Sequence, residues 1–236
     1  MNPAASSPGL SPTRLAVVAA VPFVLGMGVA LAFYGASGAS LGLFFGPMLL
    51  VSLVAPALAL AEETVRARLV AGAGLTLGVW LVWLFTGTIG LIDALRCGLI
   101  LAAWVLALAG FASLLRAAGL HAAFASTFTA LLALAWLTWP VWLSHWLTGQ
   151  SAPTWLTAPH PLLSLNGVLL DRFNAWDRRD LAYRELTVLN QDILYTMPAS
   201  IWPMVAVHVA LGMIGFTLAR LRGRKLESRF ATNEFR

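Results

Sequence analysis

Charged residues are scarce in this sequence. Asp, Glu, Lys and Arg make up 11% of its 236 residues, whereas roughly 25% is usual in a soluble domain. No Asp, Glu or Lys lies inside any of the long apolar stretches, and the charged residues nearest to them fall at their boundaries. Proton-coupled pumps and many ion-coupled carriers hold their ion on ionisable residues at mid-membrane. The sequence therefore argues against both mechanisms.

Cysteine and lysine each occur once, as Cys97 and Lys225. A single cysteine excludes an internal disulfide framework. The phosphate-binding motif GxxxxGK(S/T) is absent, so any ATP hydrolysis must come from a partner chain. The four histidines do not fall at metal-ligand spacing, and no Ser or Cys lies in a nucleophile elbow or beside a base. We therefore predict that the chain is not an enzyme and has no catalytic residue, metal site or cofactor.

Long apolar stretches fill most of the chain. Hydrophobic residues make up 59% of it, and the mean hydropathy is +0.81. Six stretches have the roughly 20 residues that a helix needs to cross a bilayer, namely residues 15–34, 41–61, 69–91, 97–115, 122–147 and 199–219. Backbone polar groups in lipid must pair within their own segment, so such stretches are helices. The predicted fold class is an all-α, polytopic membrane protein with six transmembrane helices.

The basic residues predict how these helices are oriented. With a cytoplasmic N-terminus, ten of the fifteen Lys and Arg residues lie on the inner side and five on the outer side, as the positive-inside rule favours. We expect a multi-pass protein of the cell (inner) membrane with both termini in the cytoplasm. The sequence pI is about 10.3, but the basic residues lie at helix ends, where they meet anionic membrane lipid. They form no patch that would bind nucleic acid.

Five segments follow from this topology. We predict a disordered tail over residues 1–13, transmembrane helices one to five over 14–147, an outer loop with short amphipathic helices over 148–198, the sixth transmembrane helix over 199–221 and a basic cytoplasmic tail over 222–236. The first apolar run with the GASGAS after it also resembles a signal peptide and its cleavage site. That run is longer than the usual core of roughly 7–15 residues.

Small residues at intervals of four predict close helix contacts. They occur into the second apolar stretch and within the third, as Gly38, Gly42, Gly46, Gly74 and Gly78. Glycine at this spacing lets two helix backbones approach each other. The contacts are either internal or part of a subunit interface.

Four tryptophans share one face of the fifth predicted helix. Trp136, Trp139, Trp142 and Trp146 fall within about 120° of one another at the helical repeat. They form either an aromatic belt at the membrane surface or one wall of an apolar substrate path. Pro140 lies among them and is expected to kink the helix.

The outer loop carries an amphipathic pattern just before its most charged part. Leu169, Phe173 and Trp176 lie near one helical face, with Asp171 and Arg172 off it, which predicts a helix in the membrane interface. The loop either caps the bundle as a solvated segment or recruits a substrate.

Three segments resemble ABC transporter permeases of the six-helix exporter type. These are GFASLLRAAGLHAAFASTFTALLALAWLTWPVWL at 110–143, HPLLSLN at 160–166 and AEETVRAR at 61–68. They are similar to the fourth-to-fifth helix region, the loop before the last helix and the inner coupling turn of that family. The inner turn lacks the family's full Glu-Arg-x-x-Gly-Thr pattern.

The resemblance implies a permease subunit that pairs with a cytoplasmic ATPase subunit and a second permease chain and moves an apolar or amphipathic substrate outward. It also implies that the inner turn contacts the ATPase, through Glu62, Glu63, Arg66 and Arg68. The alternative is a non-transporting accessory or assembly subunit of a larger membrane complex.

Overall fold

The structure is a bundle of long apolar helices. This computed structural model describes residues 11–38, 40, 42–142, 153–170 and 197–233. Its long helices are α1 (Pro12–Ser37), α2 (Gly42–Ala61), α3 (Val65–Phe85), α4 (Leu91–Ala117), α5 (Ala122–Trp142) and α10 (Trp202–Asn233). All six are long and apolar enough to cross a membrane, so the predicted fold class is confirmed.

Short polar side chains fix where two of these helices begin. The Ser11 hydroxyl accepts a hydrogen bond from the Arg14 amide at 3.2 Å, directly before Pro12 at the start of α1. The Thr64 hydroxyl accepts one from the Ala67 amide at 3.1 Å at the start of α3. Both bonds satisfy amides that a helix N-terminus otherwise leaves unpaired. At the other end of α1, Gly38 has a φ of 61°, which a residue with a side chain rarely adopts.

The helices pack in pairs through glycine. A Cβ atom on Gly74 or Gly78 of α3 would overlap the backbone of α1 at Ala19 or Phe23. On the opposite side of the bundle, Gly110 of α4 packs against the backbone of α10 in the same way, at Gly212 and Gly215. The contacts of Gly74 and Gly78 are therefore internal packing, one of the two alternatives that their spacing predicts. Gly38 differs, because it ends α1 and no neighbouring atom lies within 4 Å of its Cβ position.

Helices α2 and α4 lie at the centre. Helix α2 packs against α1, α3, α4 and α5, and α4 packs against α2, α3, α5 and α10. The indole N–H groups of two tryptophans tie α2 to α3 and α4. Trp83 Nε1 donates to the Leu43 carbonyl and Trp104 Nε1 donates to the Ser52 hydroxyl, both at 2.8 Å. Buried hydrogen bonds of this kind fix the register of helices whose surfaces are otherwise uniformly apolar.

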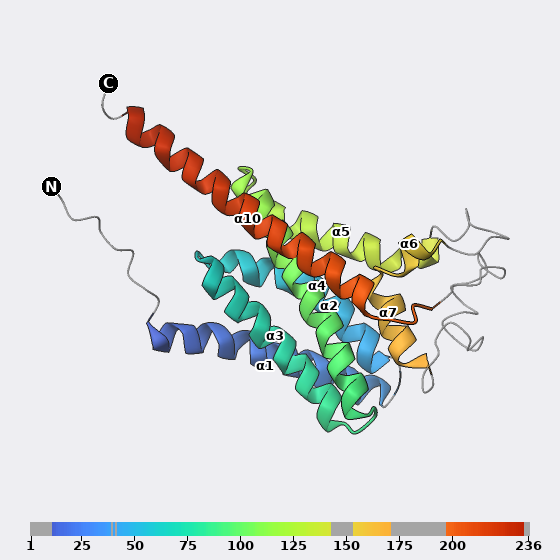
Figure 1. Cartoon of the computed structure of the whole chain (residues 1–236). Helices are drawn as coiled ribbons and strands as arrows, with labels where there is room; N and C mark the ends of the chain where they lie inside the picture. Colours follow the sequence, from blue (N-terminus) through green and yellow to red (C-terminus); the bar gives the residue numbers. More distant parts are fainter. Residues whose placement is uncertain (1–10, 39, 41, 143–152, 171–196, 234–236) are drawn as a thin grey trace.

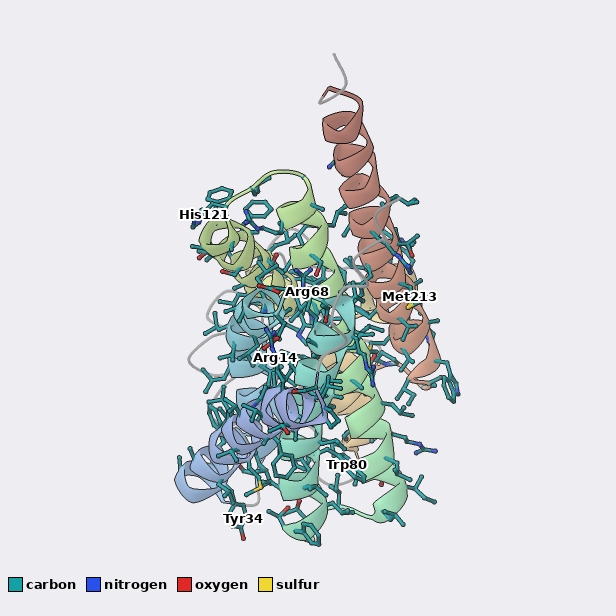
Figure 2. All side chains as sticks on the ribbon, turned by 90° about the vertical axis from the view of Figure 1, so that its left-hand side faces the viewer. Arg14, Tyr34, Arg68, Trp80, His121 and Met213 are labelled. Atoms are coloured by element: carbon teal, nitrogen blue, oxygen red, sulfur yellow. The ribbon has the colours of Figure 1, made fainter. Side chains whose placement is uncertain are left out.

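The two ends of the bundle differ. The start of α1 and the end of α10 lie toward one end, and the short helices α6 (Thr154–Thr157) and α7 (Pro161–Val168) lie at the other (Figure 1). The last turns of α10 project beyond the other helices (Figures 1 and 2). The start of α1 and the end of α10 therefore lie at the same end of the bundle, as an even number of spans requires. Short helices before the last span are also as predicted.

Several helix boundaries differ from the ends of the apolar stretches. Helix α3 begins at Val65 and α4 at Leu91, so their first turns include charged residues. An Asp93–Arg96 ion pair of 3.2 Å lies on the exposed surface of α4, where an acidic residue in the first turn suits the helix dipole. Helix α10 continues through Asn233, so the segment predicted as a tail continues the sixth helix. Hydropathy marks the lipid-compatible part of a helix, whereas helical hydrogen bonding continues into water.

Candidate functional site

A cleft of about 560 Å³ lies between α5 and α10. Both helices pack on α4, which supplies the floor of the cleft. Its walls are almost entirely apolar and include Phe111 of α4, Leu132 and Ala133 of α5, and Leu211 and Ile214 of α10. Leu132, Leu211 and Ile214 are each at least half exposed. In a membrane these side chains face lipid, so the cleft is accessible from the bilayer.

The cleft contains two polar ring nitrogens with capacity to spare. Trp136 Nε1 is buried and has no hydrogen-bond partner among the described residues. His208 Nδ1 lies 2.9 Å from the Met204 carbonyl oxygen, so Nδ1 carries the proton and Nε2 is left as an acceptor. A buried N–H without a partner costs free energy. An N–H donor and a nitrogen acceptor are therefore buried in the wall of a cleft whose other lining residues are almost all apolar.

His208 is held in place by a chain of contacts that reaches α2. Its ring meets the Trp104 ring edge-on, with the centroids 5.1 Å apart. Trp104 in turn donates to the Ser52 hydroxyl, and Ser52 donates to the Met48 carbonyl oxygen at 2.7 Å. His208 therefore bonds to a carbonyl of its own helix, while its ring packs against α4. Its place on a cleft wall depends on the α4–α10 packing, which the spacing of residues along the sequence does not reveal.

The tryptophan face of α5 turns partly inward. Trp139 is 2% exposed, and its ring lies 5.5 Å from the ring of His160. Trp136 lines the cleft, with its ring 5.6 Å from that of His160. Trp136 and Trp139 are therefore not turned wholly toward lipid, and a substrate path along this face stays a prediction. Trp142 is the last residue of α5, and Trp146 lies outside the described residues.

His160 connects α7 to α5. It is fully buried, its Nδ1 accepts a hydrogen bond from the Leu163 amide at 3.1 Å, and its Nε2 lies 2.9 Å from the Trp136 carbonyl oxygen. The neutral ring with its proton on Nε2 satisfies both partners. Burial lowers the pKa of His160 to about 3. Its position in the sequence gives His160 no evident role, although Pro161 after it is typical of the first residue of a helix.

The segment that contains α7 packs more tightly than expected of a solvated cap over the bundle. The residues of α7 from Pro161 to Asn166 are buried, because three leucines enter the bundle beside α4. Helix α7 ends at Val168 and Leu169 lies in a turn. Leu170 is helical again, and the residues directly after it lie outside the described part of the chain. Leu169 is buried in the core. Phe173 and Trp176 lie outside the described residues, so the rest of the predicted amphipathic helix stays a prediction.

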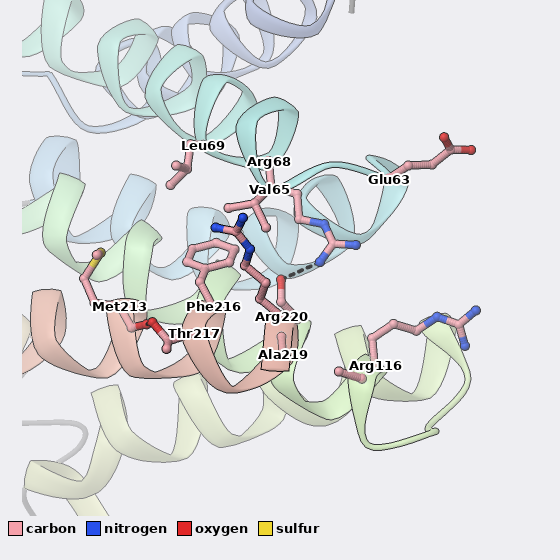
Figure 3. A pocket seen from close by; sticks show the side chains of 12 residues that line it. Glu63, Val65, Arg68, Leu69, Arg116, Met213, Phe216, Thr217, Ala219 and Arg220 are labelled. Atoms are coloured by element: carbon pink, nitrogen blue, oxygen red, sulfur yellow. Dashed lines mark hydrogen bonds between the residues drawn. The ribbon is translucent and has the colours of Figure 1, made fainter. Parts of the chain in front are cut away.

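A second cavity, of about 550 Å³, opens at the opposite end of the bundle between α3, α4 and α10. Arginines from all three helices line it: Arg68, Arg116 and Arg220. Figure 3 shows Arg68 turned inward and Arg220 extending from α10 toward α3, while Glu63 points away from the cavity. Arg68 donates from Nε to the Glu62 carbonyl and from Nη1 to the Ser113 hydroxyl, both at 2.8 Å.

The predicted ATPase-contact residues therefore separate into two groups. Glu63 and Arg66 are exposed at the turn between α2 and α3. Arg68 is half-buried and bonded to α4, and Glu62 holds Arg68 through its backbone carbonyl. Glu63 and Arg66 are thus the exposed members of this set, and Glu62 and Arg68 are partly buried.

No protein-family model, curated protein or solved structure matches this chain. The resemblance to exporter permeases therefore stays a prediction from the residues.

Proposed function

We propose that this chain is the permease subunit of an ATP-driven exporter and that it holds an apolar or amphipathic substrate in the cleft between α5 and α10. One observation carries the proposal: the Trp136 N–H has no partner among the described residues, and it lies with the His208 acceptor in the lining of an apolar cleft. A molecule with a hydrocarbon body and a hydroxyl group fits both, because a hydroxyl can accept from the Trp136 N–H and donate to His208 Nε2.

The size and access of the cleft support such a ligand. Its volume of about 560 Å³ falls within the roughly 300–1,000 Å³ of ligand pockets. Its half-exposed leucine walls let a hydrophobic molecule enter from the bilayer without passing through water. The polar pair then selects among apolar molecules, because a substrate that leaves the Trp136 N–H unpaired binds less tightly.

Energy for outward movement would come from a cytoplasmic ATPase that docks at the α2–α3 turn, with a second permease chain completing the assembly. The exposed charges of Glu63 and Arg66 fit this docking role. In the described spans no acidic residue lies deeper than the first turns, which favours coupling to an ATPase over coupling to an ion gradient.

The cleft is tested with a photoreactive long-chain alcohol added to the purified full-length chain. We expect Trp136→Phe, which keeps an aromatic ring but removes the N–H, to lower crosslinking several-fold. Trp155→Phe serves as the matched control, because Trp155 is 75% exposed and lies outside the cleft. Equal crosslinking in Trp136→Phe and the unaltered chain would remove the polar selection. The exporter assignment is tested separately, by co-purification of a cytoplasmic ATPase and stimulation of its activity by the alcohol.

An accessory or assembly subunit is the second candidate. The projection of α10 beyond the other helices favours it (Figure 1), since a helix that leaves the bundle offers a surface for a larger complex. Recovery of a membrane complex without any ATPase would support this function over the first.

A further inference from the structure

The arginine-lined cavity of Figure 3 has an excess of positive charge, because three arginines and one acidic residue, Glu63, line it. Glu62 lies close enough to Arg68 to interact with its charge, but it does not line the cavity. The described residues form one ion pair, between Asp93 and Arg96 in the first turns of α4. The cavity adjoins the last turn of α4 instead. The side chain of Arg220 makes no hydrogen bond or ion pair within the described part of the chain. Glu63 is the acidic residue on its rim and points away (Figure 3).

Arg68 is fixed in a position from which it can bind an anion. Its bonds to the Glu62 carbonyl and the Ser113 hydroxyl use two of its five N–H groups. The remaining N–H groups stay available for an oxyanion. Because the guanidinium is already held in place, it loses little further conformational freedom when it binds one. Arg220 approaches from the facing helix (Figure 3), so two guanidinium groups from α3 and α10 address one cavity.

The lower wall of the cavity is apolar and leads into a groove. Leu69, Met213 and Phe216 line the cavity beneath the arginines. A second hollow, of about 390 Å³, shares Arg68 and Leu69 with it and continues between α3 and α4. On α3 this groove reaches Leu77, which is about 12 Å deeper at the helical rise of 1.5 Å per residue.

Small residues keep the groove open. Gly72 and Ala73 on α3 face Ala102 and Ala109 on α4, and larger side chains at these positions would close it. The shape is that of a slot for one hydrocarbon chain that begins directly below two arginines.

We infer that an anionic phospholipid binds here, with its phosphate between Arg68 and Arg220 and one acyl chain in the groove between α3 and α4. A phosphate supplies the missing negative charge and accepts several hydrogen bonds from guanidinium groups. The apolar groove distinguishes a lipid from free phosphate, because inorganic phosphate has nothing to place in it. Basic pockets between membrane helices bind lipid headgroups for the same reason. This site is separate from the α5–α10 cleft, so either one can fail without the other.

The test is lipid binding to the full-length purified chain, measured by native mass spectrometry. Phosphatidylglycerol and phosphatidylcholine are titrated in parallel, and we expect the anionic lipid to bind several-fold more tightly. Arg220→Gln should lower phosphatidylglycerol affinity about fivefold, the effect of one basic residue near a lipid surface. Arg66→Gln is the matched control at the same end of α3 and should change it less than twofold, since Arg66 does not line the cavity.

The acyl chain is tested by filling the groove. Ala102→Trp should lower the affinity for both lipids, whereas Leu99→Trp, on an exposed part of α4 outside the groove, should not. Ala102 and Arg220 are both exposed, so we expect both variants to fold, which size-exclusion chromatography checks. Equal binding of the two lipids by the unaltered chain would overturn the proposal. Displacement of phosphatidylglycerol by millimolar inorganic phosphate, with no effect of Ala102→Trp, would identify a free phosphate site and equally overturn it.

Discussion

His160 lies within hydrogen-bonding distance of the one carbonyl that Pro140 frees in α5. The Trp136 carbonyl oxygen is four residues before Pro140, and a proline has no N–H to donate to that position in a helix. His160 Nε2 lies 2.9 Å from this oxygen and replaces the missing donor. Pro140 and the helix-capping His160 lie 20 positions apart in the sequence. They thus form one local structure that joins α5 to α7.

This relationship predicts a pH dependence of stability. The pKa of His160 falls from an ordinary 6.5 to about 3 in the folded chain, so between these pH values the unfolded state binds a proton that the folded state does not. The free energy of unfolding should therefore fall as pH drops below 6.5, by up to about 1.4 kcal/mol per pH unit. Thermal unfolding in detergent from pH 7 to 4 measures this slope.

Two asparagine variants isolate the contribution of His160. His160→Asn keeps a residue that caps helices but cannot titrate, so its slope below pH 6.5 should be shallower than that of the unaltered chain. His121→Asn is the control, because His121 is exposed at the start of α5. Parallel slopes for His160→Asn and the unaltered chain would show that the ring is not kept neutral by burial.

A second prediction concerns the α1–α3 contact. Gly78→Ala places a methyl group where the Phe23 carbonyl of α1 lies, and we expect it to destabilise the folded chain by about 1–3 kcal/mol through overpacking. Gly28→Ala is the control, because no neighbouring atom lies within 4 Å of that Cβ position. Alanine favours the helix there by up to about 1 kcal/mol. Equal stabilities of the two variants in thermal unfolding would contradict the close contact.

A third prediction concerns orientation. We expect a cysteine at Ser151 to be labelled by a membrane-impermeant thiol reagent on intact cells and a cysteine at Ser228 to be protected. Ten of the fifteen basic residues then lie inside. The background is Cys97→Ala, which removes the single natural thiol. Labelling at Ser228 and protection at Ser151 would reverse the orientation.

The sequence predicted the parts of this fold that depend on composition and local spacing. Apolar length alone identified six spans, and the interval between Gly74 and Gly78 predicted a close helix contact. It did not reveal that α10 meets α4 at Gly110, because that contact joins glycines with no shared periodicity. The cleft and the arginine cavity were missed for the same reason. Each is lined by two consecutive helices and by α10, which is distant in sequence. The polar groups have a recognisable arrangement only after α10 packs on the other two helices.

The last prediction concerns the partner chain. The predicted ATPase contact comprised Glu62, Glu63, Arg66 and Arg68, and of these Glu63 and Arg66 are exposed. Reversing these two, as Glu63→Arg with Arg66→Glu, should lower recovery of a co-purified ATPase about fivefold, since like charges then oppose the original partner groups. The pair keeps the net charge constant, so insertion into the membrane should be unchanged. Arg96→Glu with Asp93→Arg is the matched reversal in the first turns of α4 and should leave ATPase recovery as it was. Unchanged recovery in the Glu63 and Arg66 double variant would place the contact elsewhere or exclude it.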